Sequence, residues 1–277
     1  MAHSEGQITT ADGLSLYSET WLPKVPLKAM LAFFHGGGDH LGRFKHFAES
    51  LNAAGYGIHL ADLRGHGKSP GKRGHIMDWE EFRHDARAIM EGARSAAPDA
   101  KHLFGGHSLG GLLALSIAED NPPGYLGVIV SAPFLGMKWE PPAWKLSVAK
   151  ILSSIAPGLQ LSTDLPVEGI SRDAAIVEAY KNDPLVHGVF STRGSVEVLN
   201  TQQLVMNEAN QIKLPLLILH GTDDPIASYT KSETFYQQAG SPDKKHIAYE
   251  GFYHEVLNEL EKDRVISDIV HWMDNHL

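Results

Sequence analysis

Residues 106–111 read Gly-His-Ser-Leu-Gly-Gly, and they lie between a short apolar run and a stretch with the apolar spacing of a helix. The pattern G-x-S-x-G is typical of a sharp turn from a strand into a helix that presents a serine at its tip. Such a turn strains the backbone of the serine, and helix and strand can approach each other only where the flanking residues are small. Gly106 and Gly110 meet that need. The stretch therefore predicts an α/β unit with a reactive Ser108 at the turn.

The composition is typical of a soluble globular chain. The 277 residues are 43% hydrophobic and 21% charged, which is enough for one large core. The formal net charge of −9 disfavours a nucleic-acid partner, because phosphate binding needs clustered Lys and Arg. The chain has no cysteine, which excludes disulfides, thiolate nucleophiles and cysteine-based zinc sites.

Two further absences bear on location. The N-terminal stretch 1–10 is polar and lacks the apolar segment of a secretory signal. The sequence also has no run of about 18 apolar residues, as a membrane-spanning helix would need. We therefore expect a cytoplasmic protein whose contact with membranes is peripheral.

Strand and helix patterns alternate over the first half of the chain. Apolar runs at 29–34, 56–61 and 126–130 are typical of strands buried in a parallel sheet, and helical patterns such as 79–96 separate them. A looser alternation at 14–22 predicts an early antiparallel strand. This order is typical of βαβ units in an α/β fold.

The alternation stops between residues 135 and 210, where only helical stretches broken by prolines occur. It resumes with strands near 214–219 and 245–249. We therefore predict one α/β core made of residues 1–134 and 211–277, with 135–210 as a mostly helical insertion. The insertion should lie over the edge of the sheet that holds the carboxyl ends of the strands, which is where open α/β sheets bind ligands.

A serine hydroxyl becomes a nucleophile only when a base takes its proton and a third group orients that base. In chains with this turn the order is serine, acid, histidine. Asp223 and Asp224 follow the strand near 214–219, and His254 is the first histidine after the last predicted strand. We favour Asp224 as the acid because Gly-x-x-Asp is the usual spacing in this turn, although an aspartate there is more often a solvated turn residue or a helix N-cap. The predicted catalytic residues are Ser108, Asp224 and His254.

The reaction also needs two backbone N–H groups directed at the negative charge that develops on the carbonyl oxygen. Leu109 directly follows the serine and would supply one of them. The loop after the strand at 29–34 contains consecutive glycines, which let the backbone approach a substrate closely. Gly37 is the predicted second donor, and the alternative is that these glycines only make a tight turn.

The sequence does not match the common motifs for binding phosphate, dinucleotides or metal ions. Residues 67–69 read Gly-Lys-Ser like the end of a phosphate-binding loop, but the position five before Gly67 is Asp62 instead of glycine. No predicted strand is followed by G-x-G-x-x-G, and no two histidines have H-E-x-x-H spacing. We therefore expect no metal and no cofactor. Residues 62–69 are better suited to bracing a loop beside the site than to reacting.

A set of motifs follows one another from the first buried strand to the C-terminal region. They are His35-Gly-Gly-Gly-Asp-His40 with Arg43, Asp62-x-Arg-Gly-His-Gly-x-Ser69, Gly106-His-Ser-Leu-Gly-Gly111, Asn182-Asp-Pro-Leu185, Gly221-x-x-Asp224 and Glu250-Gly-x-Tyr-His254. In this order they resemble the motifs of monoacylglycerol lipases, among the lysophospholipase-like serine hydrolases of the α/β-hydrolase fold. The resemblance runs from about residue 8 to the C-terminus. It implies a helical cap over the core and hydrolysis of monoacylglycerols or similar single-chain acyl esters, without metal or cofactor.

The same resemblance implies roles for individual residues. It gives the triad and the two oxyanion donors named above, and it adds Asp39 and Arg43 as residues that hold the glycerol head of the substrate. The family usually has Glu at the position of Asp39, and its mammalian members have a second histidine where this chain has Leu257. The alternative is that Asp39 and Arg43 only brace their loop with a local ion pair.

One segment of the insertion has an apolar helical face, with lysines elsewhere on the helix. On this face lie Trp144, Val148, Ile151, Leu152 and Ile155. Two interpretations are open: the face packs on the core, or it belongs to a cap that lines an acyl channel and makes transient contact with lipid surfaces. On the second interpretation, Ile151 and Leu152 contact the substrate.

The pattern thus predicts a serine ester hydrolase that cleaves monoacylglycerols through an acyl-enzyme. The scaffold is shared by lysophospholipases, general carboxylesterases and proline iminopeptidase-like enzymes, and fold alone does not separate them. A protein of another class, an α/β-hydrolase that only binds a ligand, typically lacks one member of the triad. This chain has all three.

Overall fold

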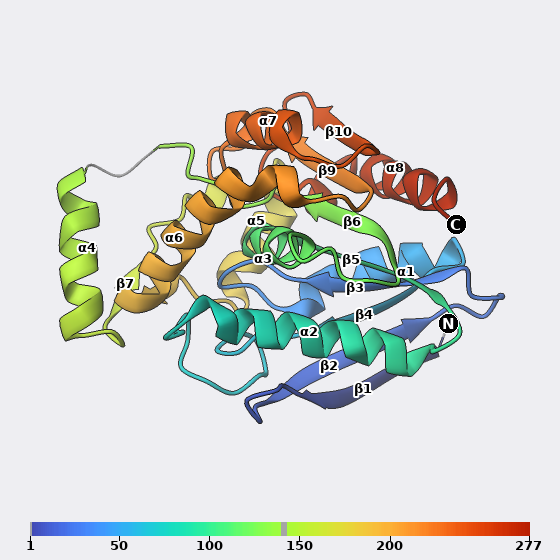
Figure 1. Cartoon of the computed structure of the whole chain (residues 1–277), viewed down its shortest axis with the longest axis horizontal. Helices are drawn as coiled ribbons and strands as arrows, with labels where there is room; N and C mark the ends of the chain where they lie inside the picture. Colours follow the sequence, from blue (N-terminus) through green and yellow to red (C-terminus); the bar gives the residue numbers. More distant parts are fainter. Residues whose placement is uncertain (1, 140–142) are drawn as a thin grey trace.

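The apolar runs of the sequence form the interior of a mostly parallel sheet (Figure 1). The computed structural model describes residues 2–139 and 143–277, and within them this sheet has eight strands in the order β1-β2-β4-β3-β5-β6-β9-β10. The strands are β1 (Ala2–Thr9), β2 (Ser15–Leu22), β3 (Ala29–Phe34), β4 (Gly57–Ala61), β5 (Lys101–His107), β6 (Tyr125–Ser131), β9 (Leu216–Gly221) and β10 (Lys244–Tyr249). β2 runs antiparallel to β1 and β4, and the other neighbours are parallel.

Helices cover both faces of the sheet, which confirms the predicted fold class (Figure 1). They are α1 (Lys45–Ala53), α2 (Trp79–Ala96), α3 (Leu109–Ala118), α4 (Ala143–Ile155), α5 (Ala174–Asn182), α6 (Thr192–Glu208), α7 (Tyr229–Gln238) and α8 (Lys262–Asp274), with short 3-10 turns at Leu41–Phe44, Val167–Gly169, Ala209–Gln211 and Val256–Asn258. α1 and α8 pack on one face, and α2, α3 and α7 pack on the other. Every residue of β3, β4 and β9 is buried as a result, which explains their nearly unbroken apolar runs.

The sequence predicts the antiparallel strand β2 but gives no sign of β1. β1 is polar and forms the edge of the sheet, and its residues are exposed apart from the partly buried Ile8. Since this strand covers no core, nothing forces an apolar alternation into its sequence. Its pairing with β2, in which Ile8 lies opposite Leu16, holds it in place.

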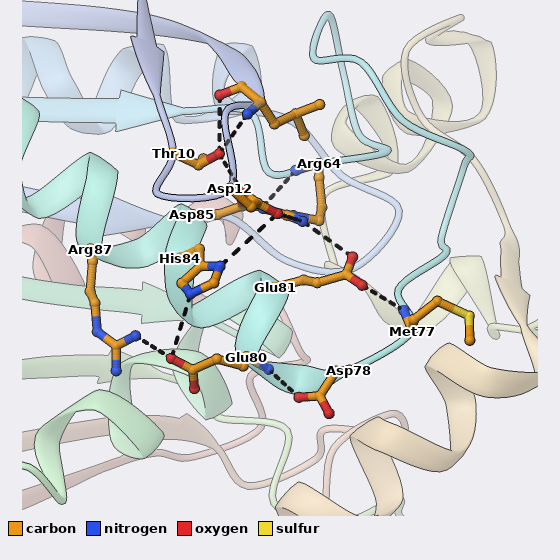
Figure 2. A network of polar contacts seen from close by, with 11 residues as sticks. Thr10, Asp12, Arg64, Met77, Asp78, Glu80, Glu81, His84, Asp85 and Arg87 are labelled. Atoms are coloured by element: carbon orange, nitrogen blue, oxygen red, sulfur yellow. Dashed lines mark hydrogen bonds and ion pairs between the residues drawn. The ribbon is translucent and has the colours of Figure 1, made fainter.

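The turn between β1 and β2 is attached to the rest of the fold by Arg64 (Figure 2). The guanidinium of Arg64 lies 2.7 Å from a carboxylate oxygen of Asp12 in that turn and 2.6 Å from one of Asp85 on α2. Nearby, the carboxylate of Asp62 accepts hydrogen bonds from the backbone N–H groups of Leu41 at 2.8 Å and Lys68 at 2.7 Å. The segment after β4 therefore braces the loop that follows β3, as its sequence indicates.

Between β6 and β9 the chain leaves the sheet and forms α4, α5 and α6 (Figure 1). The prediction of helical stretches alone is wrong in one respect, because β7 (Gln160–Ser162) and β8 (Val189–Ser191) pair into a small antiparallel sheet. Strands of this length are too short to show an alternation in the sequence. α4 lies at one end of the molecule and packs against α6.

Candidate active site

Ser108 lies at the turn between β5 and α3, where the sequence predicts it. Its φ of 53° and ψ of −115° place it in the left-handed range, which side chains other than glycine rarely adopt. The turn is also tightly packed: a Cβ at Gly106 would lie 2.3 Å from the carbonyl oxygen of Gly110, and one at Gly110 would lie 2.1 Å from that of Phe34. Both positions therefore need glycine, and the close packing holds the strained serine in place.

Two loops from the C-terminal part of the chain meet this serine. Asp224 follows β9 and His254 follows β10, and because these strands are parallel neighbours, both loops leave the same edge of the sheet. His254 Nε2 lies 2.9 Å from Ser108 Oγ, and His254 Nδ1 lies 2.7 Å from Asp224 Oδ2. The structure thus brings the three residues into one hydrogen-bonded row.

The two adjacent aspartates have different surroundings. Asp224 is buried, and its Oδ1 accepts hydrogen bonds from the backbone N–H groups of Ile226 at 2.7 Å and Ala227 at 2.9 Å. Burial raises the pKa of Asp224, but two neighbouring imidazoles more than offset this and hold that pKa well below its usual range. Asp223, in contrast, is exposed. Asp224 is therefore the carboxylate that faces His254.

Opposing effects set the protonation of His254. Burial lowers its pKa, but the charge of Asp224 and the hydrogen bond to it raise that pKa by more, and the result lies above the ordinary value of an imidazole. The ring centroid of His107 is 4.8 Å away, and burial lowers the pKa of His107 to about 3. His107 is thus neutral where His254 titrates. Within the described part of the chain, no group of three or more His, Asp or Glu side chains is arranged to hold a metal ion.

The glycine-rich loop after β3 lies against the turn of Ser108. A Cβ on Gly36 would be 3.4 Å from Ser108 Cβ, and a Cβ on Gly37 would be 3.3 Å from Leu109 Cδ2. Gly37, Leu109 and Ser108 all line the same cavity. A Cβ at Gly36 or Gly37 would thus meet the turn at about van der Waals distance, whereas a Cβ on Gly38 would lie 2.2 Å from the carbonyl oxygen of His187, so the loop needs glycine at position 38.

This cavity has a volume of about 680 Å³. Its apolar lining includes Phe134, Trp139, Leu161, Ile170, Phe190 and Ile226. The polar lining includes Asp39 and Glu255, and Glu255 directly follows His254 in the chain. The cavity can therefore hold an apolar chain together with a polar group close to the serine.

Asp39 and Arg43 belong to a buried charged cluster with Glu255, a residue to which the sequence motifs assign no role. The Arg43 guanidinium makes two hydrogen bonds to Glu255, at 2.7 and 2.6 Å, and lies 3.2 Å from Asp39 Oδ1. Its centre is 4.7 Å from the ring centroid of Tyr180. The ion pair considered from the sequence is thus present, and Arg43 also connects the glycine-rich loop to the loop of His254. The sequence contains one indication of this role, because Glu255 directly follows the predicted base His254.

Comparison with known proteins agrees with this geometry. The profile of the family described as serine aminopeptidase, S33, matches residues 25–261. A monoacylglycerol lipase of Mycolicibacterium smegmatis is 31% identical, over 99% of this chain and 98% of that one. The chain belongs to the α/β-hydrolases related to monoacylglycerol lipases. A phospholipase of Bacillus subtilis is 30% identical over 93% of this chain and 99% of its own. The crystal structure of a monoacylglycerol lipase from Paleococcus ferrophilus superposes with a TM-score of 0.86 at 35% identity, covering 95% of this chain and 99% of that one.

In this α/β-hydrolase the predicted apolar face of α4 is turned away from the cavity. Ile151 is 60% exposed, and neither Ile151 nor Leu152 is among the described residues that line the cavity. Ala149 of the same helix lines it instead, and the buried Ser153 lies on that side of the helix as well. This corrects the expectation that Ile151 and Leu152 line an acyl channel. Most of the face is exposed and does not pack on the core, and Leu152 is half-buried. The small side chains of Ala149 and Ser153 allow this side of α4 to lie close to the rest of the protein.

His220 is a second residue to which the sequence motifs assign no role. It lies near the end of the buried strand β9, and its Nε2 is 2.9 Å from Asp224 Oδ2, the oxygen that also contacts His254. The sequence contains one indication of this contact: His220 ends an otherwise apolar run, and a buried imidazole needs a hydrogen-bond partner.

Proposed function

We propose that this α/β-hydrolase cleaves monoacylglycerols to a fatty acid and glycerol. The observation that carries the proposal is the hydrogen-bonded row of Ser108, His254 and Asp224 at a largely apolar cavity with carboxylates beside it. A serine in such a row attacks acyl esters. The proteins from M. smegmatis and P. ferrophilus named as monoacylglycerol lipases support this substrate class.

The reaction proceeds in two halves. His254 Nε2 takes the proton of Ser108 Oγ, which attacks the ester carbonyl, while Asp224 orients the imidazole and stabilises its positive charge. The backbone N–H groups of Gly37 and Leu109 hold the oxyanion of the tetrahedral intermediate. His254 then gives its proton to the leaving glycerol oxygen, and the acyl group remains on Ser108. In the second half, water attacks the acyl-enzyme by the same route, and the fatty acid leaves.

The polar end of the cavity favours a neutral head group. Asp39 and Glu255 both line it, and they share the guanidinium of Arg43. Glycerol hydroxyls can donate hydrogen bonds to these carboxylates, whereas a phosphate would meet charges of its own sign. We therefore place the glycerol head near Asp39 and Arg43. Because a site built to bind hydroxyls discriminates strongly against substrates that lack them, lysophospholipids should react more slowly.

Residues 135–210 act as a cap in this proposal, and α4 is the part of the cap that meets lipid. On α4, Trp144, Val148, Ile151 and Ile155 are 65%, 45%, 60% and 77% exposed. A contiguous apolar face of this kind marks a surface that binds another apolar surface. No helix in the described residues is long and apolar enough to cross a bilayer. A peripheral contact through α4 would deliver single-chain esters to the cavity from a membrane.

A hydrolysis panel tests the proposal. It contains mono-, di- and triacylglycerols, lysophosphatidylcholine, lysophosphatidate, p-nitrophenyl esters and aminoacyl amides, with acyl chains matched where possible. We expect kcat/KM for monoacylglycerols to exceed that for lysophospholipids by about tenfold or more, in line with the unfavourable charge. Faster turnover of a lysophospholipid or of an aminoacyl amide would overturn the proposed substrate class.

A matched control separates catalysis from binding. The Ser108→Ala variant should bind monoacylglycerol but not hydrolyse it, and a fluorophosphonate probe should label the natural protein and not this variant. Failure of the natural protein to react with the probe would favour a protein that only binds its ligand.

A further inference from the structure

The carboxylate of Asp224 contacts two imidazoles. Its Oδ2 lies 2.7 Å from His254 Nδ1 and 2.9 Å from His220 Nε2. The second imidazole, that of His220, is not among the described residues that line the substrate cavity, and the reaction described above does not use it. His220 is nevertheless fully buried, so its position is fixed by what surrounds it.

The hydrogen bonds of His220 determine which of its nitrogens carries the proton. An ionised carboxylate can only accept, so His220 Nε2 must donate to Asp224. His220 Nδ1 lies 2.8 Å from the hydroxyl oxygen of Ser232, which is fully buried on α7, and it accepts that hydroxyl proton. A neutral imidazole in one tautomer satisfies both contacts. The carboxylate of Asp224 therefore fixes His220 as its donor, and Ser232 holds the opposite nitrogen of the ring.

The other neighbours of His220 leave this arrangement undisturbed. The ring of Tyr229 from α7 packs edge-on at 5.8 Å between centroids, and His246 of β10 stacks on the ring of Tyr229 at 5.6 Å. Burial lowers the pKa of His246 to about 4, so this group is neutral near pH 7. The charge that faces His220 is thus the carboxylate of Asp224, with His254 beyond it.

We propose that His220 is a positioning residue for the hydrolytic reaction, which holds Oδ2 of Asp224 in line with His254 through its Nε2–H. This inference rests on the proposed role of Asp224 in the triad. The backbone donors of Ile226 and Ala227 bind only Oδ1, so they leave the other oxygen free to shift toward or away from His254. The bond from His220 removes that freedom. It also takes up part of the negative charge that Asp224 would otherwise direct at His254.

Loss of the bond should have two consequences. The Asp224 carboxylate becomes less well placed, which lowers kcat about tenfold, the loss that corresponds to one hydrogen bond to a charged group. The carboxylate also becomes more basic, so it stabilises the protonated form of His254 more strongly. The acid limb of the rate profile then moves to higher pH, by about half a unit or more.

The test compares His220→Leu with His220→Gln. Leucine removes the donor, whereas the glutamine amide can place an N–H group near the position of the imidazole Nε2. His246→Leu is the matched control, because it removes a neighbouring imidazole from the adjacent strand β10 without touching Asp224. Ser232→Ala is a second and milder perturbation, since it removes the partner of His220 Nδ1 and leaves the ring free to shift away from Asp224. Each variant is first checked for cooperative thermal unfolding.

Rates are measured with p-nitrophenyl butyrate over a pH series, together with the rate of labelling by a fluorophosphonate. These probes report on Ser108 whatever the natural substrate is, so failure of the monoacylglycerol proposal would leave this test valid. We expect His220→Leu to lower kcat with little change in KM and to move the acid limb, with a partial effect in Ser232→Ala. His220→Gln should restore the limb and most of kcat.

Two results would overturn the inference. One is an equal loss in His220→Leu and His246→Leu, which would show only the packing role of a buried ring. The other is an acid limb that stays in place in both His220→Leu and Ser232→Ala. If His220→Leu does not fold, the Ser232→Ala profile alone decides between the two.

Discussion

Helices α3 and α4 are both rich in apolar residues, and the fold uses them in opposite ways (Figure 1). Every residue of α3 is buried, and its first turn carries Ser108 at its start. On α4, large apolar side chains such as Trp144 and Ile155 are 65% and 77% exposed. The buried helix holds a nucleophile in one close-packed position, whereas the exposed helix offers an apolar surface that another apolar surface can cover.

The two helices differ in how tightly their surroundings constrain them. The turn before α3 is strained and surrounded by backbone, so that Gly106 and Gly110 accept no larger side chain. α4 packs mainly against α6 and contributes Ala149 to the cavity. Substitutions near α3 should therefore change the chemistry, and substitutions on the outer face of α4 should change which substrates reach it.

The largest effect is expected for Ser108→Ala. Removal of the nucleophile should lower kcat by about 10⁴- to 10⁶-fold, because the triad acts as a unit. The melting temperature should stay close to that of the natural protein, since alanine fits where serine does. Residual turnover within tenfold of the natural rate would refute the assignment of the nucleophile.

Asp224→Asn should come next and should be compared with Asp223→Asn. Asparagine at position 224 cannot stabilise the protonated imidazole, and we expect a loss of about 10³- to 10⁴-fold in kcat. Asp223 is exposed, so its change should alter the rate less than about twofold. Steady-state rates of the two variants on one p-nitrophenyl ester give the answer, and a larger loss at Asp223 would reverse the assignment of the acid.

Ile151→Glu tests the role of the exposed apolar face of α4. A charge on the outer face of α4 should lower the rate on long-chain monoacylglycerols in vesicles about tenfold, because it weakens contact with the lipid surface. The rate on p-nitrophenyl acetate in solution should change less than about twofold, since Ile151 does not line the cavity.

The matched control for Ile151→Glu is Leu204→Glu, which adds the same charge at a leucine of α6 that is 50% exposed and lies outside the α4 face. It should leave both rates nearly unchanged. Equal losses of Ile151→Glu on vesicles and on acetate would indicate a folding defect and argue against lipid contact.

The smallest expected effect is the pH dependence of kcat/KM. His254 must be neutral to act as a base, and its pKa lies above the ordinary value because Asp224 outweighs burial. The value of kcat/KM should therefore rise with pH through a midpoint above about 6.5 and fall about tenfold per unit below it. Because the midpoint belongs to the buried site, Ile151→Glu should leave it unchanged. A midpoint well below 6.5 in the natural protein would contradict the described surroundings of His254.

Local features of the chain predict much of this site. The turn of Ser108 is encoded by its own neighbours, and the acid and base follow strands whose apolar runs are visible in the sequence. Parallel strands then bring their following loops to one edge of the sheet. The choice of Asp224 over Asp223 agrees with a hydrogen-bond pattern in the structure that the spacing alone does not contain.

Partners that lie far apart in the sequence could not be predicted. Arg43 binds Glu255, 212 positions along the chain, and His220 shares Asp224 with His254. Such contacts depend on which loops meet after the sheet has formed. The edge strand β1 was missed for a related reason, because it buries too little to show a pattern.

Neighbouring residues in the chain therefore encode the class of fold, the nucleophile and the order of its partners, because hydrophobic periodicity and turn geometry depend on short stretches of sequence. Only the tertiary structure shows that Glu255 and His220 join the site and that the apolar face of α4 points to solvent. A helical pattern in the sequence indicates that one face of the helix is apolar, but it does not indicate what that face contacts in the folded protein. That is determined by the packing of α4 against α6, which buries the side of α4 that carries Ser153 and leaves the apolar face outside.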